Sequence, residues 1–309
     1  MKPLDQCRRG FTMIELLVST VVGLVVIGGT LAFAQTTWRD IETNALREDT
    51  FRDARFVSMA LERDFAYTGV GLASTVEFGS LMVSGDTVMI LSVPYTPAQA
   101  FAHGLNVPDT GPNPLPPGGT CGARCVDLML APDSTADIAV GDLLRIQVND
   151  ARRLLWVEDM RAVGDTAFTV DWSNFSTLMH LPAGLSGGLV LDRFSTYVQK
   201  LAPVIYYVDG TTLYRAEGLT ASGAPNGQPI ADGIFQWDVR VIFADGDEAD
   251  EINVMDADIT NDYDDLLGVR ITAEIGADVI DVRVDDGQRF TRDFEWRFTP
   301  RNLTYERNR

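Results

Sequence analysis

The residues best suited to chemistry in this chain lie close to its N-terminus. Two arginines precede Gly10 and Phe11, and the apolar run at residues 11–34 contains Glu15 as its only charged residue. An ionised side chain in hydrocarbon costs on the order of 2.5–3.5 kcal/mol on insertion scales, so Glu15 needs a cationic partner. Hydrolysis of the peptide bond between Gly10 and Phe11 would supply one, because the new α-amine of Phe11 could pair with Glu15 of the same chain or of a neighbouring chain.

The segment at residues 10–17, with the sequence GFTMIELL, resembles the class III signal of type IV pilins and their relatives. This resemblance implies that a prepilin peptidase cleaves between Gly10 and Phe11 and that Phe11 is then N-methylated. It also implies that Glu15 sets the register of one subunit against the next in a helical filament. The implied partners are other pilins and minor pilins, together with an inner-membrane assembly platform.

The apolar run is long enough to cross a membrane. At about 1.5 Å per residue, a helix over residues 11–34 is roughly 36 Å long. Three basic residues precede the run, whereas Arg39 after it is balanced by acidic neighbours. The positive-inside bias therefore predicts a single-pass inner-membrane protein with a cytoplasmic N-terminus. The remainder is expected in the periplasm or, as part of a pilus, at the cell surface. An uncut signal anchor with Glu15 near the membrane interface is the alternative interpretation.

The helical pattern continues beyond the apolar run. Residues 35–67 contain neither proline nor glycine, and Gly69 and Gly71 end the pattern. Apolar residues recur there at spacings of three and four, as in an amphipathic helix that covers a globular domain. They are Trp38, Ile41, Ala45, Ala54, Val57, Leu61 and Phe65, with Phe51 and Met59 nearby.

Short runs of β-branched and apolar residues, separated by Gly, Asp and Pro, predict strands in most of the remaining sequence. These runs are 76–83, 87–93, 126–131, 143–148, 154–157, 167–172, 189–191, 194–198, 205–208, 211–215, 235–243, 268–275, 279–284 and 290–298. The dipeptide Asp209-Gly210 suits a hairpin turn with positive φ. Polar and apolar residues alternate in several runs, which favours antiparallel sheet with one solvated face.

Three parts are therefore expected in the chain. They are a leader at residues 1–10, a helix at 11–67 whose membrane-spanning part is about 11–34, and a β-rich domain at 68–309. The predicted fold class is α+β, with a long N-terminal helix packed on a large antiparallel β-rich domain, as in a pilin.

Two cysteines, Cys121 and Cys125, close the Pro- and Gly-rich stretch at residues 94–125. An even pair in an oxidising compartment predicts a disulfide that closes a tight loop. A metal site there would need further ligands, and the sequence places no histidine or third cysteine nearby.

Residues 245–265 include ten acidic residues and neither lysine nor arginine. Clustered carboxylates suit Ca²⁺, so Asp245, Asp247 and Asp250 are candidate ligands. Their spacing does not match an EF-hand loop, and a solvated acidic loop is the favoured interpretation. No other cofactor is expected. The chain has 25 basic and 44 acidic residues, for a formal net charge of −19, which opposes direct nucleic-acid binding.

One sequence feature imitates a catalytic motif. Residues 184–188 match the Gly-x-Ser-x-Gly pattern around Ser186. An α/β-hydrolase carries its histidine after the serine, whereas His103 and His180 both precede Ser186. A glycine-rich loop is the favoured interpretation, and no enzymatic activity is expected.

A second resemblance is to the PilW-like minor pilins. The helix end at residues 62–69 (ERDFAYTG), the acidic insertion followed by the strand at 268–271 (GVRI), and Arg301-Asn302 near the C-terminus are similar to features of those chains. The resemblance implies a structural subunit of a type IV pilus or of its initiating tip. A J-type pseudopilin of a type II secretion system shares the N-terminal features, although such chains are usually shorter. A bitopic surface-binding protein outside any filament is the third hypothesis.

Overall fold

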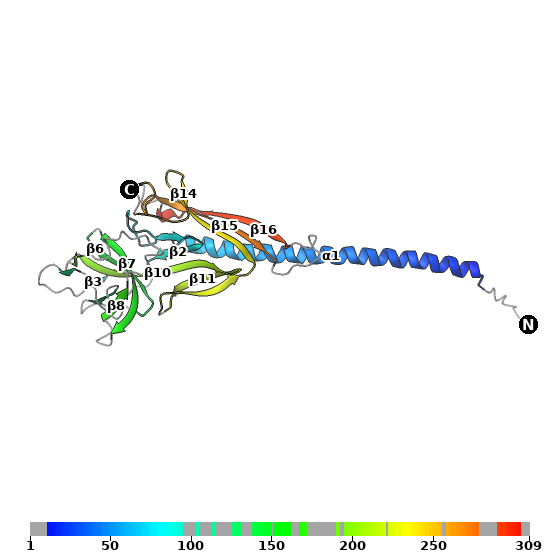
Figure 1. The fold of residues 1–309 in the computed structure, drawn as a ribbon, viewed down its shortest axis with the longest axis horizontal. Helices are drawn as coiled ribbons and strands as arrows, with labels where there is room; N and C mark the ends of the chain where they lie inside the picture. Colours follow the sequence, from blue (N-terminus) through cyan, green and yellow to red (C-terminus); the bar gives the residue numbers. More distant parts are fainter. Residues whose placement is uncertain are drawn as a thin grey trace, which may run out of the picture.

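A computed structural model of the chain shows a long helix that leads into antiparallel sheets (Figure 1). It describes residues 11–94, 103–104, 113–114, 125–130, 138–149, 151–161, 167–171, 190–191, 195–220, 222–254, 258–277 and 289–303. Helix α1 (Met13–Phe65) has 53 residues, and its first half projects from the sheets as a stalk. The predicted α+β class, with a long N-terminal apolar helix ahead of a large antiparallel β-domain, is confirmed.

The sequence explains where α1 begins and ends. Thr12 has extended backbone dihedrals, and its side chain caps the first turn. Proline is absent from the whole helical segment, so the backbone ladder continues without a break. The helix ends at Phe65, and Gly69 and Gly71 follow with positive φ, a conformation that glycine adopts readily. The predicted limits of 11–67 are therefore correct to within two residues at each end.

The described strands form three sheets, and every pairing between them is antiparallel. A ten-stranded sheet contains β1 (Leu81–Ser84), β2 (Thr87–Ser92), β3 (His103–Gly104), β5 (Cys125–Met129), β6 (Leu143–Val148), β7 (Ala151–Arg161), β8 (Ala167–Asp171), β10 (Thr196–Asp209), β11 (Thr212–Leu219) and β12 (Pro225–Ala231). A four-stranded sheet contains β13 (Ile234–Phe243), β14 (Glu248–Ala249), β15 (Leu266–Gly276) and β16 (Thr291–Phe298). Strands β4 (Asn113–Pro114) and β9 (Val190–Leu191) form a two-stranded ladder.

The second half of α1 lies between the two larger sheets (Figure 1). Val57, Leu61 and Phe65 are buried in one apolar cluster with residues of both sheets. Phe65 stacks on Phe298 of β16 with ring centroids 4.5 Å apart. Burying each such side chain contributes on the order of 1.5–3 kcal/mol, so the helix is a central part of the core.

Residues 196–198 and 205–208, which come from two predicted strands, belong to the single strand β10. The sequence suggests a break because Pro203 lacks the backbone N–H that a ladder needs. In the structure β10 changes partners at this point, since Leu201 is the last residue paired with β6 and Ala202 the first paired with β2. Among the described strands Pro203 has a neighbour on one side only, so the strand tolerates proline there.

Other strand predictions differ from the structure, miss a strand or lie outside the described residues. Residues 76–80 do not begin a strand, because Thr75 and Phe78 form an isolated bridge and Gly79 lies against the ring of Tyr263. Strand β12 was not predicted, since its proline and glycine resemble loop sequence. The predicted strand at 279–284 lies outside the described residues.

Gly233 gives a test of the contact between the two sheets. Its φ is +74°, and a Cβ there would lie 2.1 Å from the carbonyl oxygen of Gly276. Gly210 has a similar φ of +64°, but no described atom lies within 4 Å of its Cβ position. We expect Gly233→Ala to lower the free energy of unfolding by about 1–3 kcal/mol more than Gly210→Ala. Urea denaturation in detergent solution measures both, and equal losses would contradict the steric argument.

Candidate functional site

The first turn of α1 holds the carboxylate of Glu15 against the residue that follows Phe11. The backbone N–H of Thr12 donates to Oε2 of Glu15 at 3.1 Å, and the Thr12 hydroxyl donates to the same oxygen at 3.0 Å. The backbone N–H of Glu15 donates in return to Oγ1 of Thr12 at 3.3 Å. This capping box directs the acid toward the chain end that cleavage after Gly10 would create.

The apolar half of α1 suits a membrane. The helix is long and apolar enough to span one, and none of the residues in its most apolar 18-residue stretch is buried. The hydroxyls of Ser19, Thr20 and Thr30 donate to backbone carbonyls three or four residues earlier. Polar groups in hydrocarbon need such internal partners, so these side chains are compatible with lipid.

The extramembrane half of α1 has a second apolar face that the β-domain leaves exposed. Trp38 and Phe56 are 64% and 53% exposed, and Ile41 and Met59 are similarly exposed. Phe56 follows Trp38 by 18 residues, and Met59 follows Ile41 by the same number. Because 18 residues equal about five helical turns, the four side chains form one stripe. Around the helix the buried Val57 lies about 100° from Trp38 and Phe56 and about 160° from Ile41 and Met59. The prediction that Trp38, Ile41 and Ala45 share the domain-facing side is therefore wrong, because all three are exposed.

A buried charged network fixes the end of α1 to the ten-stranded sheet. Asp64 is only 5% exposed, and its Oδ2 accepts hydrogen bonds from the Tyr206 hydroxyl at 2.6 Å and from Nε of Arg215 at 2.5 Å. Its Oδ1 accepts from Nε of Arg63 at 2.9 Å. Arg215 also pairs with Glu217. Burial, and then the hydrogen bond to Asp64, raises the pKa of Tyr206, so its hydroxyl stays a donor.

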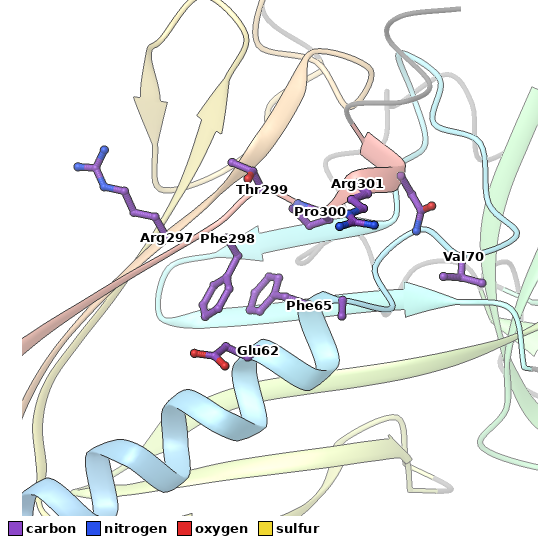
Figure 2. Close-up of a pocket in the computed structure, with 10 residues that line it drawn as sticks. Glu62, Phe65, Val70, Arg297, Phe298, Thr299, Pro300 and Arg301 are labelled. Atoms are coloured by element: carbon purple, nitrogen blue, oxygen red, sulfur yellow. The ribbon is translucent and has the colours of Figure 1, made fainter.

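The chain after β16 returns to the same helix end. Nδ2 of Asn302 donates to the carbonyl of Thr68 at 2.7 Å. A pocket of about 580 Å³ lies beside this contact. Among its lining residues, Phe65 and Phe298 lie together, and Glu62 and Arg301 contribute charged groups (Figure 2). The residues that carry the PilW-like resemblance at 62–69 and 301–302 are therefore in contact.

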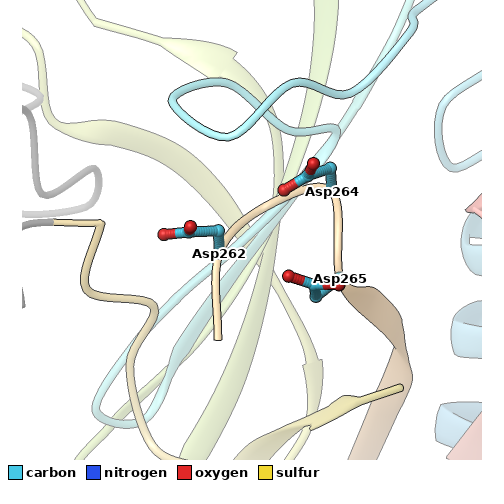
Figure 3. A group of neighbouring side chains, drawn as sticks. All are labelled: Asp262, Asp264 and Asp265. Carbon is cyan, nitrogen blue, oxygen red and sulfur yellow. The ribbon is translucent and has the colours of Figure 1, made fainter. Parts of the chain in front are cut away.

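Among the described residues, the predicted calcium ligands of the acidic segment do not form one cluster. Asp245 and Asp247 are exposed and form a local turn, in which Oδ1 of Asp245 accepts the backbone N–H of Asp247 at 3.0 Å. A different trio, Asp262, Asp264 and Asp265, lies just before β15 (Figure 3), with carboxylate oxygens within 4.8 Å of one another. Calcium binding by Asp245, Asp247 and Asp250 stays a prediction.

Two residues of the predicted sites, Gly10 of the cleavage junction and Cys121 of the disulfide, lie outside the described residues, so both sites stay predictions. His180 and Ser186, which were not expected to form a site, also lie outside the described residues. The backbone of Cys125 begins β5.

Two features of the site were not predicted from the sequence. The capping box has a sequence signal, since Thr12 and Glu15 have the Thr-x-x-Glu spacing. The burial of Asp64 has no such signal, because its partners Tyr206 and Arg215 are more than 140 residues away.

Comparison with known families adds one finding to this geometry. Residues 5–31 match the prokaryotic N-terminal methylation motif. This segment contains the Gly10–Phe11 junction, Glu15 and most of the apolar run. A search of curated proteins gave no match. The motif and the apolar helix support a membrane-anchored protein of the type IV pilin or pseudopilin kind, and they point to a structural role rather than to an enzyme.

Proposed function

We propose that the chain is a minor pilin that is processed at the inner membrane and inserted into a type IV pilus or its initiating tip. The observation that carries this proposal is the position of Glu15. It is the only charge in the apolar run, and it lies one helical turn from the residue that cleavage would convert into an N-terminal amine. The methylation motif over residues 5–31 supports the same assignment.

The architecture supports assembly through α1. Residues 11–34 would pack in lipid before insertion and against the helices of other pilins afterwards. The stripe of Trp38, Ile41, Phe56 and Met59 lies on the far side of α1 from its buried face and would extend this apolar surface beyond the membrane. The β-domain, residues 68–309, would then lie outside the cytoplasm on the filament surface.

Processing is tested by the mass of the intact protein extracted from membranes. In cells with a working prepilin peptidase we expect a chain that lacks residues 1–10 and begins at N-methylated Phe11. Gly10→Val should leave the leader attached, because it replaces the glycine that ends the leader in the class III signal that this chain resembles. Gly23→Val is the matched control, since no described atom lies within 4 Å of a Cβ at Gly23. A wild-type chain that still begins at Met1 would contradict the proposal.

A pseudopilin of a type II secretion system shares the methylation motif, so processing does not separate the two assignments. Deletion of the chain separates them, since loss of surface pili indicates a minor pilin, whereas loss of a secreted enzyme with normal pili indicates a pseudopilin. An uncut chain absent from both assemblies would instead favour a bitopic surface-binding protein.

A further inference from the structure

Two arginines, Arg145 and Arg152, share one face of the sheet formed by β6, β7 and β10; we call them the arginine pair. In the register of β6 and β7, Arg145 lies opposite Leu154, and Arg152 lies opposite Gln147. The arginines are therefore diagonal neighbours on the same face, a separation that long side chains can bridge. Both are half-buried.

The hydrogen bonds of the arginine pair go to neutral groups. Arg145 donates to Oε1 of Gln199 on β10, and Arg152 donates to the backbone carbonyl of Ala73. The Nε atoms of both arginines are buried and have no acceptor among the described residues. Neither positive charge is matched by a carboxylate in the described part of the chain.

The cations on the other face of the same sheet provide the contrast. Arg153, next to Arg152, pairs with Glu77 at 2.8 Å, and Lys200, next to Gln199, pairs with Asp142 at 2.6 Å. A chain with 44 acidic and 25 basic residues has carboxylates to spare. Two half-buried arginines without such a partner are therefore unusual here, because an uncompensated charge is costly away from water.

The charges of the two arginines in the pair repel one another. Burial first, and then the nearby charge of Arg152, lowers the pKa of Arg145 to about 10. At neutral pH Arg145 therefore keeps its proton, and the two like charges face one another. An anion between them would relieve this repulsion.

We propose that the arginine pair binds a small oxyanion, a carboxylate or phosphate group that enters from solvent and bridges the two guanidinium groups. The planar guanidinium fork matches the oxygen spacing of either group. The net charge of −19 opposes a long polyanion, but distant acids are screened over about 8 Å at physiological salt, so a single group can approach. Strands β6 and β7 lie at the end of the molecule opposite the N-terminus of α1 (Figure 1). The proposal does not depend on assembly into a filament.

The test is the melting temperature of the full-length protein in detergent, measured in chloride, phosphate and acetate at equal ionic strength. We expect phosphate or acetate at saturating concentration to raise the melting temperature by about 2–4 °C relative to chloride. The double variant Arg145→Gln/Arg152→Gln should lose this rise. Arg240→Gln is the control and should keep it, because Arg240 is a surface residue already paired with Asp238.

The separate arms identify the source of the oxyanion. A rise in acetate alone assigns a carboxylate, such as an acidic side chain of another protein, and a rise in phosphate alone assigns a phosphate group. No rise in either, or the same rise in the double variant, overturns the proposal.

A second measurement uses the protein without added oxyanion. In chloride, Arg145→Gln removes an uncompensated charge and keeps a polar group, so it should melt at or above the wild-type temperature. A decrease of several degrees, or failure to fold, would show that the charge of Arg145 is already compensated within the free protein, and would overturn the proposal.

Discussion

Replacing Asp64 with alanine is expected to lower the free energy of unfolding of the β-domain by about 3–5 kcal/mol. Breaking a buried ion pair from one side costs this much, because it leaves the other charge desolvated and unpaired. Here the substitution would leave Arg215, whose side chain is 14% exposed, with Glu217 alone, and would leave the buried Tyr206 hydroxyl without its acceptor. Urea denaturation followed by tryptophan fluorescence in detergent solution measures the loss.

Two matched variants divide the effect among the partners of Asp64. Tyr206→Phe removes one hydrogen bond to a charged group and should cost about 1.5–3 kcal/mol. Arg63→Ala should cost less than about 1 kcal/mol, because the Arg63 side chain is 59% exposed and solvent replaces its contact. If Asp64→Ala cost no more than Arg63→Ala, the network would not hold the end of α1 to the sheet.

The pH dependence of stability provides an independent check on the same carboxylate. Burial by itself raises the pKa of Asp64, but hydrogen bonds from Arg215, Arg63 and Tyr206 outweigh it, so the pKa lies below its ordinary value. A carboxyl group whose pKa is lower in the folded than in the unfolded protein stabilises the fold at pH values above its unfolded pKa of about 4. This stabilisation is lost as the pH falls through the pKa of the folded protein. The stability difference between wild type and Asp64→Asn should therefore shrink below about pH 4.

The sequence predicts local features of this fold well. Helix α1 is recognisable because a long segment contains no proline and because glycines follow Phe65. The turn between β10 and β11 is recognisable from the dipeptide Asp209-Gly210. In the structure Asp209 pairs with Thr212, and Gly210 has the positive φ that the turn requires. These features depend on neighbouring residues, which is why a local pattern suffices.

Features that depend on distant residues were missed. Asp64 looks like one more solvated acid on an amphipathic helix until the fold brings Tyr206 and Arg215 beside it. Spacing alone also does not distinguish the two apolar faces of α1, because Trp38 and Val57 both fit a helical repeat. Only the positions of the sheets decide that Val57 is buried and Trp38 is not.

The second large effect is expected at the other end of α1. Glu15→Gln should reduce the fraction of the protein found in sheared pili by at least about tenfold while leaving its amount in the membrane unchanged. The variant removes the charge that would pair with the Phe11 amine, and a loss of about 1.4 kcal/mol per contact already corresponds to a factor of ten. Quantitative immunoblots of the pilus and membrane fractions measure the ratio.

The capping box requires a control, because Glu15 also accepts hydrogen bonds within its own chain. Glutamine can replace glutamate in a capping box, so Glu15→Gln keeps the cap and loses only the charge. Thr12→Ala does the reverse, since it removes the hydroxyl that bonds Glu15 and keeps the carboxylate. If the charge of Glu15 sets the register between subunits, the amount of Thr12→Ala protein in pili should be within about twofold of the wild-type amount. This comparison requires that the mass of the variant shows cleavage before Phe11. The opposite result would be normal entry of Glu15→Gln into pili and failure of Thr12→Ala to enter. It would show that the filament needs a capped helix and not an ion pair, because Glu15→Gln keeps the cap and Thr12→Ala loses it.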